Sequence, residues 1–400
     1  MSRFCSAMVL CEQTSDSLTY LKAVNPADFD FENDLDIIIN NAFYSIERMP
    51  DLIYSFVARE YFCYNWVLEG GDSLHSIIIL SRLNIPSLYF TFFNTLREEL
   101  PKNKNEVDPL VIFDYAYSLI TSWKWVARYK VLVHYPKNTC YLELNKNTIF
   151  FPEFNPYKYF QFKEVDEMWK ALLTGSGLHI VAENPEILSA ATYAACSLLD
   201  PIQFLEKVLI TMNPDDERLQ HTNDYGIIST TPNVEIDSLR NIGLAVEAKL
   251  LNPGFDIEAA RNDLQSKTCS IIDVLVSLMD RVLRTNPYND ILEAPYITDD
   301  LENLFDMSKE NSKFRILPPI AFRKMEYTKS IASYRRGILF RSSFRHNFLS
   351  MKPEEALRGM SKQHLMVISN QLDKLAKKFE TDKHFVSVIN VHKKIIKKSL

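Results

Sequence analysis

The sequence predicts an α/β fold, because three short apolar segments alternate with turns and with one helix of small residues. The apolar segments are residues 178–182, 208–212 and 225–229, and the helix is residues 186–199. A proline follows each segment within three residues. Short apolar segments bounded by turn residues are typical of strands buried in a parallel or mixed sheet. We therefore predict that residues 171–233 hold the core sheet of an α/β domain.

Length and composition limit the possible classes of protein. A chain of 400 residues predicts two or three domains, and an apolar content of 46% is ample for packed cores. Glycine occurs only 9 times, and neither a G-x-G-x-x-G nor a Walker motif is present. This argues against a glycine-rich phosphate-binding loop, and we expect no cofactor.

The first 150 residues have the pattern of an α+β lobe, in which paired strands are followed by helices. Apolar runs and period-two alternation predict strands at residues 4–10, 18–24, 52–58, 61–67, 74–80, 125–133 and 139–144. Helical spacing predicts helices at residues 35–46, 86–100 and 109–122. Asn33 or Asp34 is expected to cap the first helix, and Pro86 suits the first turn of the second.

The rest of the chain divides at two stretches of irregular composition. Residues 151–162 are rich in aromatics and proline, and a linker packed on the surface is favoured over a ligand-binding box. Residues 163–285 form the core lobe, with further helices at 162–173, 234–241 and 257–283 and a strand at 244–250. Residues 286–320 are a polar linker or insertion. Residues 321–400 form a helical region, with helices at 327–348, 353–375 and 385–398.

Charge is distributed unevenly along the chain. Residues 313–400 contain 20 Lys and Arg and 6 Asp and Glu, a net charge of +14, while the remaining residues carry −20. Such asymmetry predicts an interaction surface for an anionic membrane, for an acidic partner, or for the chain's own acidic part. Of these three interpretations, pairing with the chain's own acidic part is given about half the weight.

No arrangement of residues typical of catalysis or of a metal site is found. His75 and His179 lie in predicted strands and are expected to be structural, and no H-E-x-x-H motif is present. The six cysteines are scattered, as expected of buried reduced thiols in a cytosolic protein. The acidic run that begins at Asp215 and Asp216 is expected to be solvated rather than metal-binding.

The basic C-terminal region allows several interpretations. Arg335, Arg336, Arg341 and Arg345 lie among aromatic residues, which can indicate nucleic-acid binding. Apolar residues at helical spacing favour a buried helix face instead, and no nucleic acid is expected. The final run of two lysine pairs predicts contact with an anionic membrane, and the alternative is a frayed polar terminus. These lysines are Lys393, Lys394, Lys397 and Lys398.

The sequence also bears on localisation. The first ten residues carry one positive charge and only a short apolar run, which is unlike a signal peptide. No apolar segment approaches the ~18–20 residues of a membrane-spanning helix. We expect a cytoplasmic protein, with peripheral contact to vesicle or organelle membranes.

An ordered series of segments in the core resembles the DENN-domain family. Residues 168–175 are similar to the helix and loop before that family's first core strand, and residues 178–183 to the strand itself. Residues 184–202 follow with the small-residue helix and an Asp-Pro turn. Residues 225–233 are similar to a later strand, but they end in Thr-Pro-Asn where the family has a Thr-Asn-Pro-like turn. Upstream, residues 76–90 resemble a longin-like lobe, in which a strand ending in Ser-Arg leads into an aromatic helix.

The resemblance implies three parts: a longin-like α+β lobe at 1–150, a DENN-like core at 163–285 and a downstream helical region at 321–400. It also implies a guanine-nucleotide exchange factor for a Rab-type small GTPase in membrane traffic. Exchange requires a rigid surface complementary to the nucleotide-free GTPase and makes no covalent bond. The residues expected to face the GTPase follow predicted strands: Arg82, Asn84, Asp215, Asp216, Thr230 and Thr231.

Three alternatives remain open. A protein of the same fold can serve as a non-catalytic scaffold on a membrane. Some relatives activate GTP hydrolysis through an inserted arginine, for which Arg82 is the candidate, although a surface ion pair is its commoner role. An unrelated α/β enzyme would have a deep pocket with converging polar groups at the carboxyl ends of its sheet.

Overall fold

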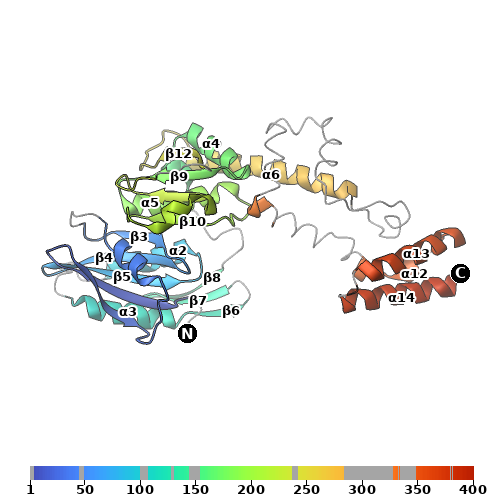
Figure 1. Cartoon of the computed structure of the whole chain (residues 1–400), viewed down its shortest axis with the longest axis horizontal. Coiled ribbons are helices and arrows are strands. Elements are labelled where there is room, and N and C mark those ends of the chain that lie inside the picture. Colours follow the sequence, from blue (N-terminus) through green and yellow to red (C-terminus); the bar gives the residue numbers. More distant parts are fainter. Residues whose placement is uncertain are drawn as a thin grey trace. The chain divides into compact units, whose positions relative to one another are not determined.

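The structure is a computed structural model of the whole chain. It describes residues 4–44, 49–99, 107–127, 130–143, 154–236, 242–282, 328–331, 333, 348–378, 380 and 382–400, with side chains of the long helix that ends at 282 described up to 272. Contacts divide the chain into two compact units, residues 1–266 and residues 267–400. The boundary falls inside the predicted core lobe at 163–285. Each unit is described by itself (Figure 1).

The first unit begins with a lobe that we call the first lobe, in which the structure describes eight strands and three helices. Its elements are β1 (Ala7–Gln13), β2 (Thr19–Asn25), α1 (Leu35–Asn41), β3 (Ile53–Val57), β4 (Phe62–Gly70), β5 (Ser73–Ser81), α2 (Pro86–Glu99), α3 (Pro109–Thr121), β6 (Lys124–Ala127), β7 (Lys130–His134) and β8 (Thr139–Glu143).

The main sheet of the first lobe is antiparallel, with the strand order β2-β1-β5-β4-β3. Two short connections make the β1–β2 and β4–β5 hairpins, and β1 then pairs with β5 across the middle. The central strand β5 is buried along nearly its whole length, from Leu74 to Ser81. The prediction of paired strands followed by helices is confirmed.

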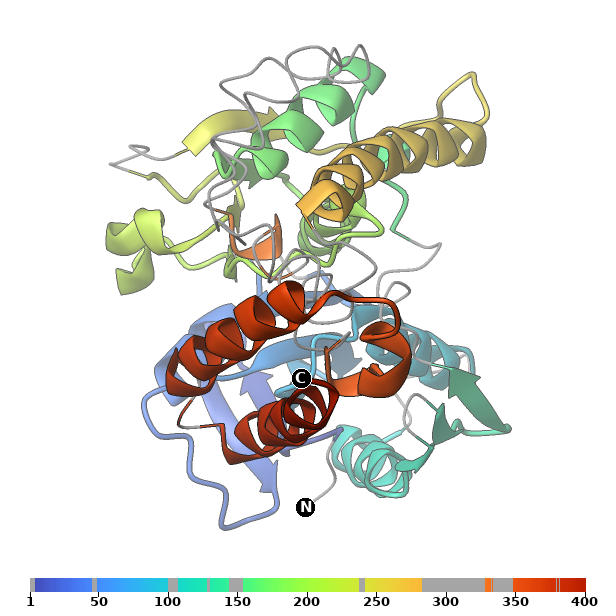
Figure 2. The same ribbon diagram turned by 90° about the vertical axis from the view of Figure 1, so that its right-hand side faces the viewer.

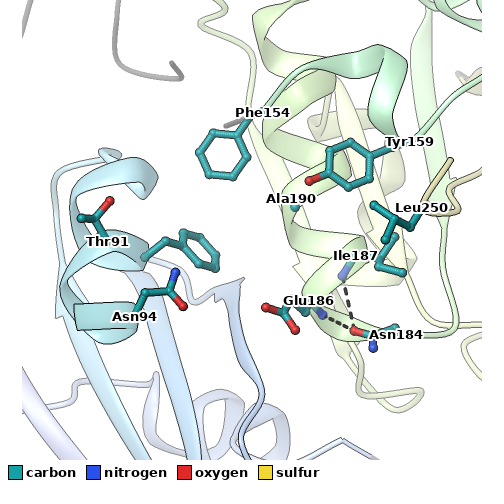
Figure 3. Close-up of a pocket in the computed structure, with 10 residues that line it drawn as sticks. Thr91, Asn94, Phe154, Tyr159, Asn184, Glu186, Ile187, Ala190 and Leu250 are labelled. Carbon is teal, nitrogen blue, oxygen red and sulfur yellow. Dashed lines mark hydrogen bonds between the residues drawn. The ribbon is translucent and has the colours of Figure 1, made fainter. Parts of the chain in front are cut away.

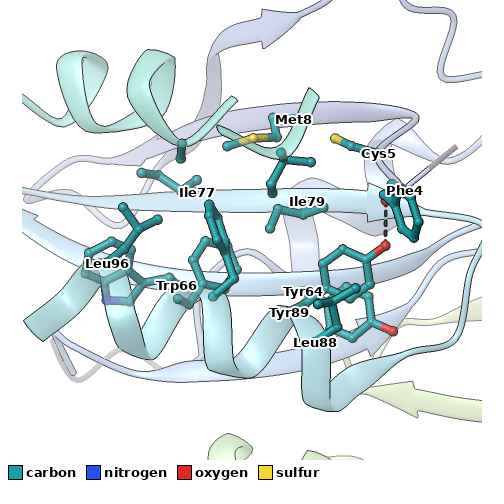
Figure 4. Packing of buried hydrophobic residues seen from close by; sticks show 14 of the residues in the cluster. Phe4, Cys5, Met8, Tyr64, Trp66, Ile77, Ile79, Leu88, Tyr89 and Leu96 are labelled. Carbon is teal, nitrogen blue, oxygen red and sulfur yellow. Dashed lines mark hydrogen bonds between the residues drawn. The ribbon is translucent and has the colours of Figure 1, made fainter. Parts of the chain in front are cut away.

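The core of the first lobe lies between this sheet and α2 and α3 (Figure 4). Tyr64 of β4 stacks on Tyr89 of α2, with ring centroids 4.2 Å apart. The Tyr89 hydroxyl donates a hydrogen bond to the Phe4 carbonyl oxygen, 2.5 Å away. Buried phenols need such a partner, because an unpaired hydroxyl in an apolar core costs about 1–3 kcal/mol.

Two predictions in the first lobe differ from the structure. The strand predicted at 125–133 is two strands, β6 and β7, which pair as a hairpin. The helix predicted at 35–46 ends at Asn41. The Tyr54 hydroxyl donates to the carbonyl oxygens of Asn41 and Ala42. The Asn65 side-chain amide also donates to the Ala42 carbonyl oxygen, so side chains of β3 and β4 supply donors at the helix end.

A second lobe completes the first unit with a parallel sheet in the order β10-β11-β9-β12, which confirms the predicted buried parallel core. A helical crossover joins β9 to β10, as parallel strands require. Its elements are η2 (Pro156–Lys158), α4 (Phe162–Leu173), β9 (Gly177–Val181), α5 (Pro185–Cys196), η3 (Ser197–Leu199), β10 (Val208–Thr211), η4 (Glu217–Asp224), β11 (Ile227–Thr230), β12 (Ile242–Glu247) and the start of α6 (Ile257–Val282).

Helix α5 explains why the sequence has a run of small residues there. It contacts β9 and β11 of its own lobe and β3 of the first lobe, so most of its side chains are buried. Ala191, Ala194 and Ala195 let both sheets approach the helix closely. The linker predicted at 151–162 is described from residue 154 onward, where η2 packs Tyr157 into the lobe.

The second unit begins within α6, and its described helices farther along the chain include α12 (Pro353–Ala356), α13 (Lys362–Lys378) and α14 (Lys383–Ser399). Helices α13 and α14 lie side by side (Figure 2). The single helix predicted at 353–375 is therefore two helices. Gly359, with φ of +82°, lies in the turn between them, a conformation that glycine adopts without a Cβ clash. The predicted linker 286–320 and nearly all of the predicted helix 327–348 lie outside the described residues.

Across the part of the chain that the structure describes, no helix is both long enough and apolar enough to cross a lipid bilayer.

Candidate functional site

The turn between β3 and β4 is the best-fixed exposed feature of the first lobe. The buried carboxylate of Asp34 accepts hydrogen bonds from the backbone N–H groups of Arg59 and Glu60, at 3.1 and 3.2 Å. Asp34 is the N-cap residue of α1, as predicted, but its side chain makes no cap hydrogen bond. It holds this turn instead.

The second lobe holds the same turn from the other side. Arg218 of η4 donates from Nη1 to the Val57 carbonyl oxygen, 2.5 Å away, and Arg59 pairs with Glu217. Burial alone would raise the pKa of Asp216, but hydrogen bonds from Arg218 and its charge outweigh burial and lower this pKa. The Asp216–Arg218 pair is therefore ionised and buried, and it fixes η4 against the first lobe.

One surface results, to which both lobes contribute exposed charges. The predicted residue Arg82 lies next to the turn, with its guanidinium carbon 5.5 Å from the ring centroid of Tyr61. The predicted residue Asp215 is exposed and immediately precedes η4. We call this surface the hairpin face, and define it by the exposed residues Arg59, Arg82, Asp215 and Glu217; the Tyr61 ring beside Arg82 is buried.

Behind the hairpin face, buried polar side chains connect the two lobes. We call this region the seam. The Asn41 side-chain oxygen accepts from the Met212 N–H and from the Thr211 hydroxyl, at 2.8 and 3.2 Å. The Ser55 hydroxyl donates to the Tyr193 hydroxyl at 2.9 Å. Such bonds are directional, so they set the relative orientation of the lobes as well as their contact.

Three of the predicted GTPase-facing residues do not form a surface. Thr230 and Thr231 are fully buried at the end of β11, and Asp216 is buried in its pair with Arg218. The Thr230 hydroxyl lies 3.0 Å from Nε2 of His179 on the neighbouring strand. The sequence could not distinguish an exposed strand exit from a buried one, because this depends on what packs over it. For these three positions the prediction is corrected.

Asn84 is half-buried in the loop between β5 and α2. Its side-chain oxygen is buried, and it has no hydrogen-bond partner among the described residues. Of the predicted residues, Arg82 and Asp215 belong to the hairpin face, whereas its other two residues, Arg59 and Glu217, were not predicted. The sequence feature that could have identified this turn is the charged pair Arg59-Glu60 between two predicted apolar strands.

The predicted membrane-contacting lysines all lie on α14 and differ in their surroundings. Lys394, Lys397 and Lys398 are exposed. Lys393 is half-buried and forms an ion pair with Asp373 of α13. Lys393 therefore contributes to the pairing of the two helices, and three lysines remain for contact with an anionic surface.

The histidines and cysteines behave mostly as structural residues. His75 is buried beside Lys22 and Glu12, and burial lowers the pKa of both His75 and His179. Burial raises the pKa of the Cys5, Cys63 and Cys196 thiols and raises that of Cys11 to about 12, which keeps them protonated. Cys269 is exposed, so the prediction of buried thiols fails there. Among the described residues, no three acidic, histidine or cysteine side chains gather as a metal site would require.

An open cleft of about 550 Å³ lies between α2 of the first lobe and the start of α5 in the second (Figure 3). Asn184 and Leu250, which follow β9 and β12, place it at the carboxyl ends of the parallel strands. This is the position at which an α/β enzyme would bind its substrate. Among the described residues that line the cleft, Glu186 is the only carboxylate.

Comparison of the chain with protein-family models and with curated proteins found no match.

Proposed function

We propose that this chain is a guanine-nucleotide exchange factor for a Rab-type small GTPase, with a longin-like first lobe and a DENN-like second lobe. The sequence resemblance suggests the family. An antiparallel lobe, a parallel lobe and C-terminal helices, in that order along the chain, are compatible with it.

The observation that carries the proposal is the double anchoring of the hairpin face. Asp34 holds the turn from within the first lobe, and Arg218 holds it from the second. Exposed side chains of both lobes are therefore presented in one preorganised arrangement. An exchange factor needs such a surface, because it must bind the nucleotide-free GTPase better than the loaded one. A surface that rearranged easily would bind the loaded and the nucleotide-free GTPase equally well. It would then not shift the equilibrium between them.

The test measures release of labelled GDP from a panel of Rab-type GTPases, with and without the full chain. We expect one or a few of them to lose GDP at least tenfold faster. Arg82→Glu should reduce this acceleration at least tenfold, because it reverses an exposed charge on the hairpin face. Lys163→Glu is the matched control, since Lys163 is an exposed cation on α4 and should leave release unchanged.

Other outcomes separate the alternatives. Stable binding of a GTPase without faster GDP release would identify a scaffold and would reject exchange. If the chain instead speeds GTP hydrolysis, and Arg82→Ala loses this effect, the chain is a GTPase-activating protein. If no GTPase binds and none loses nucleotide faster, the proposal is rejected.

A further inference from the structure

The cleft between α2 and α5 has aromatic walls. Phe90 of α2 and Phe154 pack edge to face, with ring centroids 5.9 Å apart and an angle of 70° between the rings. Tyr159 lies on the second-lobe side, and Figure 3 shows its hydroxyl directed toward the space between the helices. Burial and the nearby charge of Glu186 raise the pKa of Tyr159. Its hydroxyl therefore stays protonated at neutral pH.

The carboxylate of Glu186 points into this cleft (Figure 3). Its backbone N–H is capped by the Asn184 side chain at 2.7 Å, but no described group forms an ion pair with the carboxylate. Burial raises the pKa of Glu186 above its usual value. A half-buried carboxylate without a cation at hydrogen-bond distance is poorly solvated, and a bound cation would relieve that cost.

The guanidinium of Arg97, which acts on the charge of Glu186, is already engaged. Arg97 on α2 donates to the Asn94 side-chain oxygen at 2.6 Å and to the Asp51 carbonyl oxygen at 3.3 Å. Arg97 lowers the pKa of Glu186, but Asp51 opposes this effect. The cleft therefore keeps one carboxylate available for a ligand from outside.

We propose that this cleft binds the guanidinium group of an arginine side chain carried by a basic peptide segment of a partner protein. A guanidinium is planar, so it stacks on aromatic faces while it donates two hydrogen bonds to one carboxylate. The Tyr159 hydroxyl oxygen offers a further acceptor. Residues outside 313–400 carry a net charge of −20, which favours a basic partner.

The test uses the full chain and the peptide acetyl-Gly-Arg-Gly-amide, with binding measured by calorimetry. Its counterpart with citrulline in place of arginine has nearly the same shape and no charge. We expect the arginine peptide to bind at least tenfold more tightly than the citrulline peptide. A lysine counterpart should bind at least threefold more weakly, because an ammonium does not stack. Equal affinity for the arginine and citrulline peptides, or no binding of the arginine peptide at millimolar concentration, would overturn the proposal.

Two variants locate the site on the chain. Glu186→Gln removes the charge and should weaken binding of the arginine peptide at least tenfold. Glu183→Gln is the matched control, because Glu183 is an exposed carboxylate three residues earlier in the chain. Ala190→Trp fills the cleft and should abolish binding, with unchanged thermal unfolding showing that the fold is kept. If Glu186→Gln binds as well as the unaltered chain, the cleft is not the site. None of these measurements involves a GTPase, so failure here leaves the proposed exchange activity standing.

Discussion

The seam between the two lobes and the core of the C-terminal helices both exclude water, but different kinds of side chain build them. The seam uses buried Asn41, Ser55 and Tyr193, which exchange hydrogen bonds between the lobes. The helical core is apolar, with Ile368, Leu372 and six other buried hydrophobic residues. Apolar contacts stabilise without much preference for direction, whereas hydrogen bonds are lost if the partners turn. The difference suggests that the seam sets an orientation and that the helical core supplies stability.

The four tryptophans make this comparison measurable. Trp66, Trp123, Trp125 and Trp169 all belong to the first unit. Their fluorescence therefore reports unfolding of the two lobes, whereas far-UV circular dichroism also reports the C-terminal helices.

The largest effect is expected from Arg218→Ala. This substitution leaves the Asp216 carboxylate buried without its cation, and also removes the hydrogen bond to Val57. The free energy of unfolding followed by tryptophan fluorescence in denaturant should fall by about 3–5 kcal/mol. The double variant Asp216→Asn with Arg218→Met should recover much of this loss, because neither charge then remains. A loss below about 1 kcal/mol in Arg218→Ala would mean that the pair does not hold the seam.

The C-terminal helices should instead be weakened by acid through His392. This residue is buried, stacks on Phe348, and has its pKa lowered to about 4 by burial, which outweighs the opposite effect of Glu354. At pH values between the ordinary histidine pKa of 6.5 and the lowered pKa of about 4, His392 binds a proton in the unfolded chain but not in the folded helices. Stability should therefore fall as the pH is lowered through this window, by up to about 3 kcal/mol.

The measurement for His392 is circular dichroism in denaturant at several pH values. His392→Leu should remove the acid dependence, while His384→Gln, at an exposed position on the same helix, should keep it. Equal acid dependence in His392→Leu and in the unaltered chain would show that other groups cause it.

A smaller effect on the seam is expected from Asn41→Ala. The Met212 N–H and the Thr211 hydroxyl then lose their shared acceptor, which costs about 2 kcal/mol. Tryptophan fluorescence should detect this loss, and exchange activity should fall together with it if the seam orients the hairpin face. Full stability in Asn41→Ala would indicate that water replaces the side chain and that the seam admits solvent.

The smallest change in stability is expected from Arg59→Ala on the hairpin face. The side chains of Arg59 and Glu217 are 44% and 67% exposed, and such pairs contribute about 0–1 kcal/mol. Thermal unfolding should change little, and any change should shrink in high salt. A loss of more than about 2 kcal/mol would show that this pair belongs to the seam rather than to the surface.

Much of the fold could be predicted because it depends on local pattern. The strand β5 follows a Gly-Gly-Asp turn and carries an apolar run at residues 77–80, and the predicted range 74–80 differs from the observed strand by one residue at each end. Helices α2 and α3 begin at their predicted prolines. The hairpin of β6 and β7 was missed because the break after Ala127 contains neither glycine nor proline, so no turn residue marks it in the sequence.

The site was less predictable than the fold. Arg82 and Asp215 were expected at exposed strand exits and are exposed, while Thr230 and Thr231 were expected there and are buried. All four follow apolar runs that look alike in sequence. What separates them is the packing over each strand end.

The sequence by itself determined which segments become strands and helices, and it placed the antiparallel lobe, the parallel core and the C-terminal helices in order. These properties follow from side-chain periodicity and turn residues within a few positions of each other. Only the tertiary structure decided that Arg59 meets Glu217, 158 positions away, and that Glu186 faces an aromatic cleft. Contacts over such distances are set by how the lobes pack, and no local pattern records them.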